Sequence, residues 1–170
     1  MKILACICCL TFCFLGCSSN STSTDSTNSN TAPSFSAKFN GTPWQPTGDQ
    51  GSGVSGLVVT GIDMIKIDAS RVKGSVIEDL SITLGKIGKG SFDLTTSFDN
   101  DNHATYYIGQ KYYSTSGVVG GTGTVNVTKC DTTNHLVSGT FAIEAPNVDN
   151  NSEVLHITEG TFTDIKWYVQ

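Results

Sequence analysis

Four tyrosines within eight residues are the most distinctive group of side chains that could bind a ligand. Tyr106 and Tyr107 precede the segment 109–111, and Tyr112 and Tyr113 follow it. Neighbouring side chains of a strand point to opposite faces, so we expect one tyrosine of each pair to face the core and the other to face outward. Outward tyrosines could offer a flat surface to a sugar ring or a protein partner. Ordinary aromatic pairing across a hairpin is the alternative, and we favour it.

Sequence context argues against a nucleotide site or a catalytic nucleophile. The segment 51–56 matches G-x-G-x-x-G, but it follows a loop and precedes a predicted strand, whereas a dinucleotide site needs a strand before it and a helix after it. No serine lies in a G-x-S-x-G motif. Cys130 and His135 are separated by a predicted turn, and no third group is placed to orient the imidazole. We therefore expect an unreactive thiol.

Two turns, 99–103 and 147–153, are rich in the oxygen-bearing side chains that Ca²⁺ prefers. In the first of them, however, Ala104 stands where a calcium loop has its glycine, and Gln110 stands where it has a bidentate glutamate. The three histidines show no spacing typical of zinc ligands. Polar hairpin turns are therefore favoured at both places, and we predict no metal ion and no other cofactor.

Glycoside hydrolysis requires two carboxyl groups about 5–9.5 Å apart in a cleft. Spacing brings no such pair together, although five acids of the folded part remain candidates: Asp93, Asp99, Asp101, Glu144 and Glu159. The formal net charge is −5, and the chain has no cluster of Lys and Arg that could bind phosphates. The sequence therefore argues against a nucleic-acid partner and gives no direct support to an enzyme.

The first 17 residues have the features of a bacterial lipoprotein signal. Lys2 is followed by a mostly apolar stretch, residues 3–15, which as a helix would span only about 20 Å and is too short for a bilayer core of about 30 Å. The sequence Phe14-Leu15-Gly16-Cys17 resembles the lipobox, in which the cysteine is lipidated and becomes the new N-terminus. Phe14 departs from the leucine that is usual at that position. An ordinary cleaved secretion signal is the alternative.

Residues 18–34 are predicted to be a disordered tether, because 14 of these 17 residues are Ser, Thr or Asn. The expected organisation is therefore a signal peptide (1–16), the lipidated Cys17 with its tether (17–34) and one folded domain (35–170). No acidic run follows Cys17 directly, since the first acid is Asp25. Such a run resembles a surface-export signal in some lipoproteins, so we expect the periplasmic side of the outer membrane rather than the cell surface.

From residue 35 onward, apolar residues recur with a period of two, which is typical of strands with one buried face. Turn signals separate these runs at short intervals. The predicted fold is all-β, either an antiparallel β-sandwich or a partly open β-barrel of about eight to ten strands. Trp44 and Trp167 are expected in its core. The single helix candidate, 70–79, contains Gly74 and offers at most one short turn.

The segments 35–44, 137–141 and 157–162 resemble the landmarks of a family of small Bacteroidetes lipoproteins, domain-of-unknown-function family 6252. The resemblance covers essentially the whole folded domain, and it implies an all-β secreted domain without implying an activity. Gly139 and Gly160 lie inside strand patterns, where glycine weakens a strand unless a bulge or a close backbone approach requires it. The apolar register shifts after Glu159, so we predict a bulge at Gly160.

These observations together favour a non-enzymatic binding or structural module that is tethered in the bacterial cell envelope. The lipid on Cys17 would anchor the module to the membrane. A glycan or protein partner would contact the surface near the four tyrosines. Two alternatives stay open. One is an envelope glycan hydrolase, which needs converging carboxylates. The other is a lipocalin-like carrier of a small apolar ligand, which needs a hollow barrel.

Overall fold

A computed structural model describes residues 34–47, 53–59, 63–95, 102–117 and 120–170 of the chain. The predicted signal peptide, Cys17 and nearly all of the predicted tether lie outside the described residues. Eleven strands form in the described part, namely β1 (Ser34–Phe39), β2 (Thr42–Trp44), β3 (Val54–Val59), β4 (Met64–Lys73), β5 (Val76–Leu84), β6 (Gly90–Leu94), β7 (His103–Ile108), β8 (Lys111–Ser114), β9 (Thr122–Asp131), β10 (Leu136–Pro146) and β11 (Val154–Val169).

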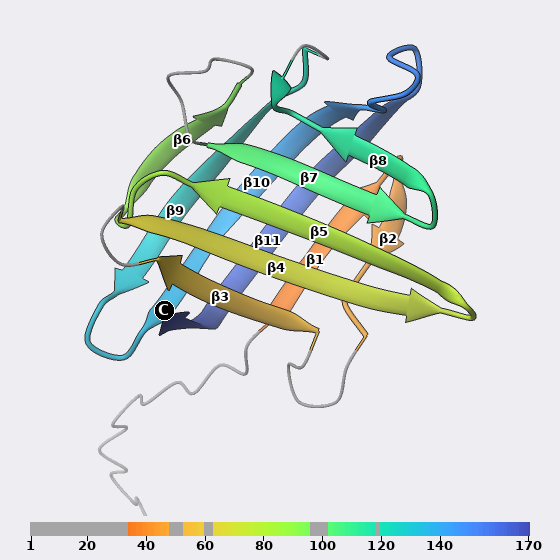
Figure 1. Cartoon of the computed structure of the whole chain (residues 1–170). Helices are drawn as coiled ribbons and strands as arrows, with labels where there is room; N and C mark the ends of the chain where they lie inside the picture. Colours follow the sequence, from red (N-terminus) through yellow and green to blue (C-terminus); the bar gives the residue numbers. More distant parts are fainter. Residues whose placement is uncertain (1–33, 48–52, 60–62, 96–101, 118–119) are drawn as a thin grey trace, which may run out of the picture. The chain divides into compact units, whose positions relative to one another are not determined.

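All eleven strands belong to one sheet, in the order β6-β9-β10-β11-β3-β4-β5-β7-β8, with β1 between β11 and β2. The sheet curls over itself into a half-barrel, as Figure 1 shows. The sixteen-residue β11 makes the curl possible, because it pairs with β1 over its first part and with β3 over its last residues. This confirms the all-β prediction. The β11–β3 pair is parallel, whereas the other pairs among the described strands are antiparallel.

The curl places two layers face to face, one formed by β3, β4, β5, β7 and β8 and the other by the remaining strands. A second contact, away from the β11–β3 pair, links these two layers. Tyr113 of β8 forms an isolated bridge with Asn147, which directly follows β10. The backbone N–H of Val148 also donates to the carbonyl oxygen of Tyr112 at 2.9 Å. These bonds hold the edge strand β8 against the opposite layer and so limit the exposure of its unpaired backbone groups.

The apolar alternation seen in the sequence fills the space between the layers. In β4 the side chains of Ile65, Ile67 and Ala69 are buried, and in β5 those of Leu80 and Ile82 are buried. Inward-facing residues of the other strands join them in one contiguous hydrophobic cluster. Trp44 and Trp167 belong to it with 1% and 4% of their surface exposed, which confirms the prediction that both lie in the core.

The helix candidate 70–79 forms no helical turn and is instead a β-hairpin. Strand β4 continues to Lys73, and β5 begins at Val76 after a tight turn in which Gly74 has a φ of +64°. Val72 lies opposite Ile77 in the resulting hairpin. The β-branched residues of this segment favour a strand, and the cross-strand contacts of a hairpin outweigh a weak helix propensity.

Two copies of the tripeptide Gly-Thr-Phe lie side by side in β10 and β11. Gly139 is paired with Phe162, and Phe141 is paired with Gly160. A Cβ atom on Gly160 would lie 2.5 Å from Cδ2 of Phe141, and one on Gly139 would lie 2.6 Å from Cζ of Phe162. Each phenyl ring therefore covers the glycine opposite it, an arrangement that allows close approach of ring and backbone.

The predicted bulge is present next to Gly160. The pairing of β10 with β11 shifts between Phe141 and Ile143, and the pairing of β1 with β11 shifts between Ser36 and Lys38. Glu159 takes the left-handed conformation, with a φ of +52°. The bulge therefore includes Glu159. Glycine is needed at position 160 because the phenyl ring of Phe141 lies over it.

Candidate functional site

The four tyrosines lie on the β7–β8 hairpin as the period-two pattern predicts. Tyr106 pairs with Tyr113 and faces inward, while Tyr107 pairs with Tyr112 and faces outward. The two outward rings stack on each other, with centroids 4.4 Å apart and an angle of 22° between their planes. The hairpin pairing that we favoured is therefore present. Instead of lying side by side as a flat surface, Tyr107 and Tyr112 stack face to face, with Tyr107 49% exposed and Tyr112 half-buried.

The inward-facing Tyr106 belongs to a buried polar cluster that the sequence did not reveal. Its hydroxyl donates to Oε2 of Glu78 at 2.6 Å, and Nε1 of Trp44 donates to the same oxygen at 2.7 Å. One terminal guanidinium nitrogen of Arg71 contacts both oxygens of Glu78, at 2.8 and 2.9 Å. Trp44, Arg71, Glu78 and Tyr106 are called the Glu78 cluster below.

The Glu78 cluster joins strands of both layers. Trp44 comes from β2, Arg71 from β4, Glu78 from β5 and Tyr106 from β7. The guanidinium carbon of Arg71 lies 5.3 Å from the centroid of the Trp44 ring, and Phe39 stacks on the same ring at 4.7 Å. The cluster therefore closes one part of the half-barrel with charge-assisted hydrogen bonds and ring contacts.

Burial and hydrogen bonding act in opposite directions on the carboxyl group of Glu78. Burial alone would raise its pKa, but the hydrogen bonds from Tyr106, Arg71 and Trp44 outweigh that effect and hold the pKa below its ordinary value. Burial and the neighbouring Glu78 carboxylate raise the pKa of Tyr106. Glu78 is 3% exposed and its oxygens are occupied, so it stays an anion that stabilises the fold and is not available as a proton donor.

The lowered pKa of Glu78 leads to a pH-dependent stability. Because the native state holds this carboxyl group deprotonated, the stabilisation is present above its ordinary pKa of 4.5 and is lost as the pH falls below that value. We expect urea midpoints that decline between about pH 5 and pH 3 in the wild type, with a shallower decline in Glu78→Gln. An equally steep decline in the variant would show that other carboxyl groups govern acid unfolding.

A second candidate site lies on the outer face of the β6-β9-β10-β11 layer. A surface groove of about 430 Å³ is lined by Asp93, Glu144 and His156, together with threonines of β9 and β11. Nδ1 of His156 lies 3.4 Å from a carboxylate oxygen of Glu144, and both side chains are largely exposed. The fold therefore brings two of the five candidate acids to one groove, which sequence spacing did not predict.

Of the remaining candidate acids, the structure describes only Glu159, which does not line that groove. Glu159 borders a neighbouring depression and forms an ion pair with Lys38 at 2.7 Å. Asp99 and Asp101 lie outside the described residues.

A third surface feature is a polar depression of about 310 Å³ on the outer face of β3, β4 and β5, here called the β4–β5 depression. Nζ of Lys66 lies 2.9 Å from Oδ1 of Asp68, and the hydroxyl of Ser81 donates to that same oxygen. Asp79 also lines the depression, and it lies directly opposite Tyr107 of the neighbouring strand β7. The depression and the stacked tyrosines are therefore adjacent on one face.

The turn 147–153 uses its oxygen atoms internally. Oδ1 of Asn147 accepts hydrogen bonds from the backbone N–H groups of Asp149 and Asn150. Oε1 of Glu153 accepts from Lys111 and from the hydroxyl of Tyr113, each at 2.6 Å. Within the described ranges, no group of three or more His, Cys, Asp and Glu side chains could hold a metal ion. Most of the other acidic turn, 99–103, lies outside the described residues.

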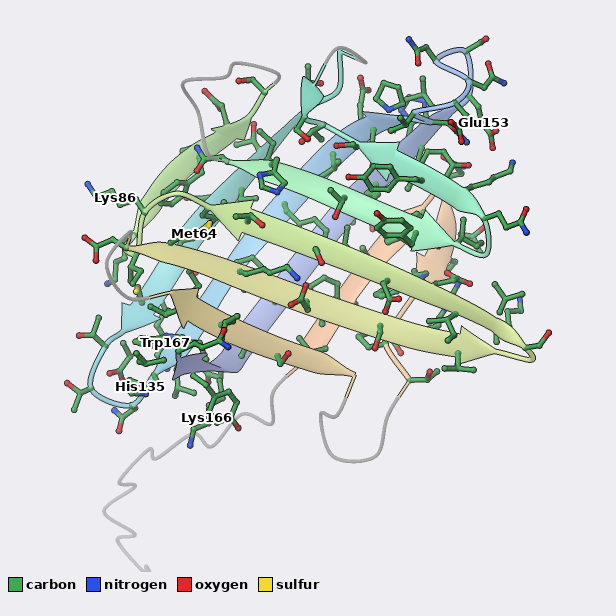
Figure 2. All side chains as sticks on the ribbon, in the orientation of Figure 1. Met64, Lys86, His135, Glu153, Lys166 and Trp167 are labelled. Carbon is green, nitrogen blue, oxygen red and sulfur yellow. The ribbon has the colours of Figure 1, made fainter. Side chains whose placement is uncertain are left out.

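Cys130 and His135 have separate surroundings. Burial raises the pKa of the half-buried Cys130 thiol, which disfavours the reactive thiolate. The imidazole of His135 stacks on Trp167 with ring centroids 4.2 Å apart, near the C-terminal end of β11, as Figure 2 shows. This arrangement supports an unreactive thiol and gives His135 a packing role.

Arg71 and Glu78 were not among the candidate residues predicted from the sequence. A signal existed in β5, where Glu78 occupies the same face as the apolar Leu80, Ile82 and Leu84. A charged residue at an inward position requires partners, and a buried Trp44 or Tyr106 likewise requires a partner for its N–H or O–H group.

The family model described as a domain of unknown function, DUF6252, matches residues 31–166. No curated protein and no solved structure matches the chain. Across the residues that the structure describes, no helix is both long and apolar enough to cross a membrane. The family match spans the complete set of strands up to the last residues of β11, and the chain therefore belongs to the DUF6252 family.

Proposed function

We propose that this protein is a bacterial envelope lipoprotein, anchored through a lipidated Cys17 at the periplasmic side of the outer membrane. The sequence of residues 1–17 supports the anchor, since a short apolar stretch ends in Gly16-Cys17. Acyl chains on Cys17 would contribute about 0.8 kcal/mol per buried CH₂ group, which holds a protein on a bilayer without a spanning helix.

The folded domain acts as a non-enzymatic binding or structural module. The observation that carries this proposal is the outward-facing stack of Tyr107 and Tyr112 on the β7–β8 hairpin, in which Tyr107 is 49% exposed. Rigid aromatic side chains give large contact areas at a low entropic cost. Glu78, whose side chain is 4% exposed, and Arg71 are engaged with each other and support the fold.

Lipidation is tested by replacing the modified residue. In a bacterial host, we expect Cys17→Ser to abolish incorporation of labelled palmitate and to release the protein from the membrane fraction. Globomycin, which inhibits the lipoprotein signal peptidase, should cause the wild-type precursor to accumulate. Cys13→Ser is the matched control, since this cysteine lies in the discarded signal. Normal membrane retention and labelling of Cys17→Ser would contradict the anchor.

Binding is tested with the outward stack. Mature protein immobilised through its C-terminus should retain an envelope component that Tyr107→Ala and Tyr112→Ala fail to retain. Tyr168→Ala is the control, because this tyrosine is also exposed but lies on β11. Equal retention by wild type and by both hairpin variants would exclude the stack as the binding surface.

A glycan hydrolase is the second candidate function, and the groove that Asp93 shares with Glu144 favours it. Two carboxyl groups in one groove are the minimum that acid–base cleavage of a glycosidic bond requires. Purified protein should then release reducing ends from peptidoglycan or polysaccharide, and both Asp93→Asn and Glu144→Gln should abolish that release. An activity that survives both substitutions would have another origin.

The carrier alternative receives less support from the interior. Rings from opposite layers meet there, since Phe39 of β1 contacts Tyr106 of β7 with centroids 5.0 Å apart. The contiguous hydrophobic cluster occupies space that a lipocalin-type carrier keeps open for its ligand.

A further inference from the structure

One ring face of Tyr107 is open toward the neighbouring strand β5. Its other face is covered by Tyr112, which lies opposite it on β8. Because β7 lies between β8 and β5, the open face is turned toward β5, where Asp79 is the directly opposite residue. Tyr107 is 49% exposed, so a ligand could reach this face from solvent. The ring of Tyr107 therefore lies beside Asp79, on the β7 side.

The β4–β5 depression lies at the other side of Asp79 and supplies polar groups. Ser70 lies opposite Asp79 on β4, and Ser81 and Asp68 follow along the same face. Asp68 already accepts hydrogen bonds from Lys66 and Ser81. Among the described residues, by contrast, Asp79 has no hydrogen-bond or ion-pair partner. Its exposed carboxylate is thus a free acceptor beside an open aromatic face.

This combination fits a ligand that has both an apolar face and several hydroxyl groups. A pyranose ring presents C–H groups on one face, which pack on an aromatic ring, while its hydroxyl groups donate to carboxylates and serine oxygens. A purely apolar ligand would leave Asp79 desolvated without a partner, which is costly.

Charge narrows the ligand class further. Asp68 and Asp79 contribute two negative charges to the depression, and Lys66 contributes one positive charge. Like charges across an interface disfavour binding, so uronic-acid, sialic-acid and sulfated glycans should be repelled. We propose that the face formed by Tyr107, Asp79 and the β4–β5 depression binds a neutral pyranose glycan. This inference rests on the proposed function as a binding module and names its ligand class.

The test uses the mature protein purified in detergent and titrated calorimetrically with cellohexaose, mannohexaose, xylohexaose and hexagalacturonate. At least one neutral hexasaccharide should bind, and hexagalacturonate should bind more weakly. Tyr107→Ala should weaken binding of the neutral ligand about tenfold. The affinity of Tyr107→Phe should stay within about twofold of the wild-type value, because the ring face is kept. Asp79→Asn should weaken binding of the neutral ligand about fivefold and reduce the discrimination against hexagalacturonate. Tyr168→Ala should bind as the wild type does.

Three results would overturn the proposal: no binding by any neutral hexasaccharide, unchanged binding by Tyr107→Ala, or equal affinity for hexagalacturonate. The envelope retention experiment separates this failure from failure of the proposed function. If the immobilised domain retains another protein, and Tyr107→Ala no longer retains it, the glycan proposal is wrong and the proposed binding module remains. If no component depends on Tyr107, both proposals are wrong.

Discussion

Replacing Glu78 by Gln should destabilise the protein by about 3 kcal/mol, because breaking a buried ion pair leaves its partner charge uncompensated. Glu78 accepts hydrogen bonds from Trp44, Arg71 and Tyr106, and an amide group would direct N–H groups toward these donors. Removing one partner of a buried ion pair usually costs about 3–5 kcal/mol of stability. We expect the lower end of that range because the side chain of Arg71 is 21% exposed and partly solvated. The free energy of unfolding in urea measures the effect.

Glu144→Gln is the matched control for this substitution. Glu144 makes a solvent-exposed contact with His156, so the same chemical change should alter stability by no more than about 0.5 kcal/mol. A loss in Glu78→Gln as small as that of the control would show that the cluster does not contribute to stability.

A double substitution separates the ion pair from general packing. Arg71→Met together with Glu78→Leu removes both charges and keeps apolar volume at both positions. Because an uncompensated charge causes most of the loss in each single variant, the double variant should lose less than the sum of the two singles. Additive losses would indicate that the two side chains act independently.

The sequence predicts those parts of the fold that depend on local pattern. The inward and outward positions of Tyr106 and Tyr107 follow from the period of two, and so does the burial of Ile65 and Ile67. The register shift after Glu159 likewise reveals the bulge. These features need no knowledge of which strand lies beside which.

The features that sequence could not predict depend on pairing between distant strands. Asp93 and Glu144 reach one groove only because β6 and β10 both flank β9. The curl of the sheet requires the parallel pair of β11 with β3, and no local pattern specifies that pair. Asp79 gains its significance from lying opposite Tyr107. Residue types thus indicate which groups could bind, whereas strand order decides which of them meet.

The repeated Gly-Thr-Phe tripeptide connects the family landmarks with a stability prediction. Phe141→Ala should cost about 3–5 kcal/mol, because a large buried ring is removed from the core. Gly160→Ala should cost about 1–3 kcal/mol in the wild-type background, since its methyl group would lie 2.5 Å from the Phe141 ring. Thr140→Ala, at an exposed position between Gly139 and Phe141, should change stability by no more than about 0.5 kcal/mol.

The decisive measurement is Gly160→Ala in the Phe141→Ala background. Once the ring is absent, the new methyl group has space, so the cost of Gly160→Ala should fall close to zero or become a gain. Urea unfolding of the wild type, the two singles and the double variant gives the coupling energy. Equal costs of Gly160→Ala in both backgrounds would show that backbone conformation, rather than the ring of Phe141, requires glycine at this position.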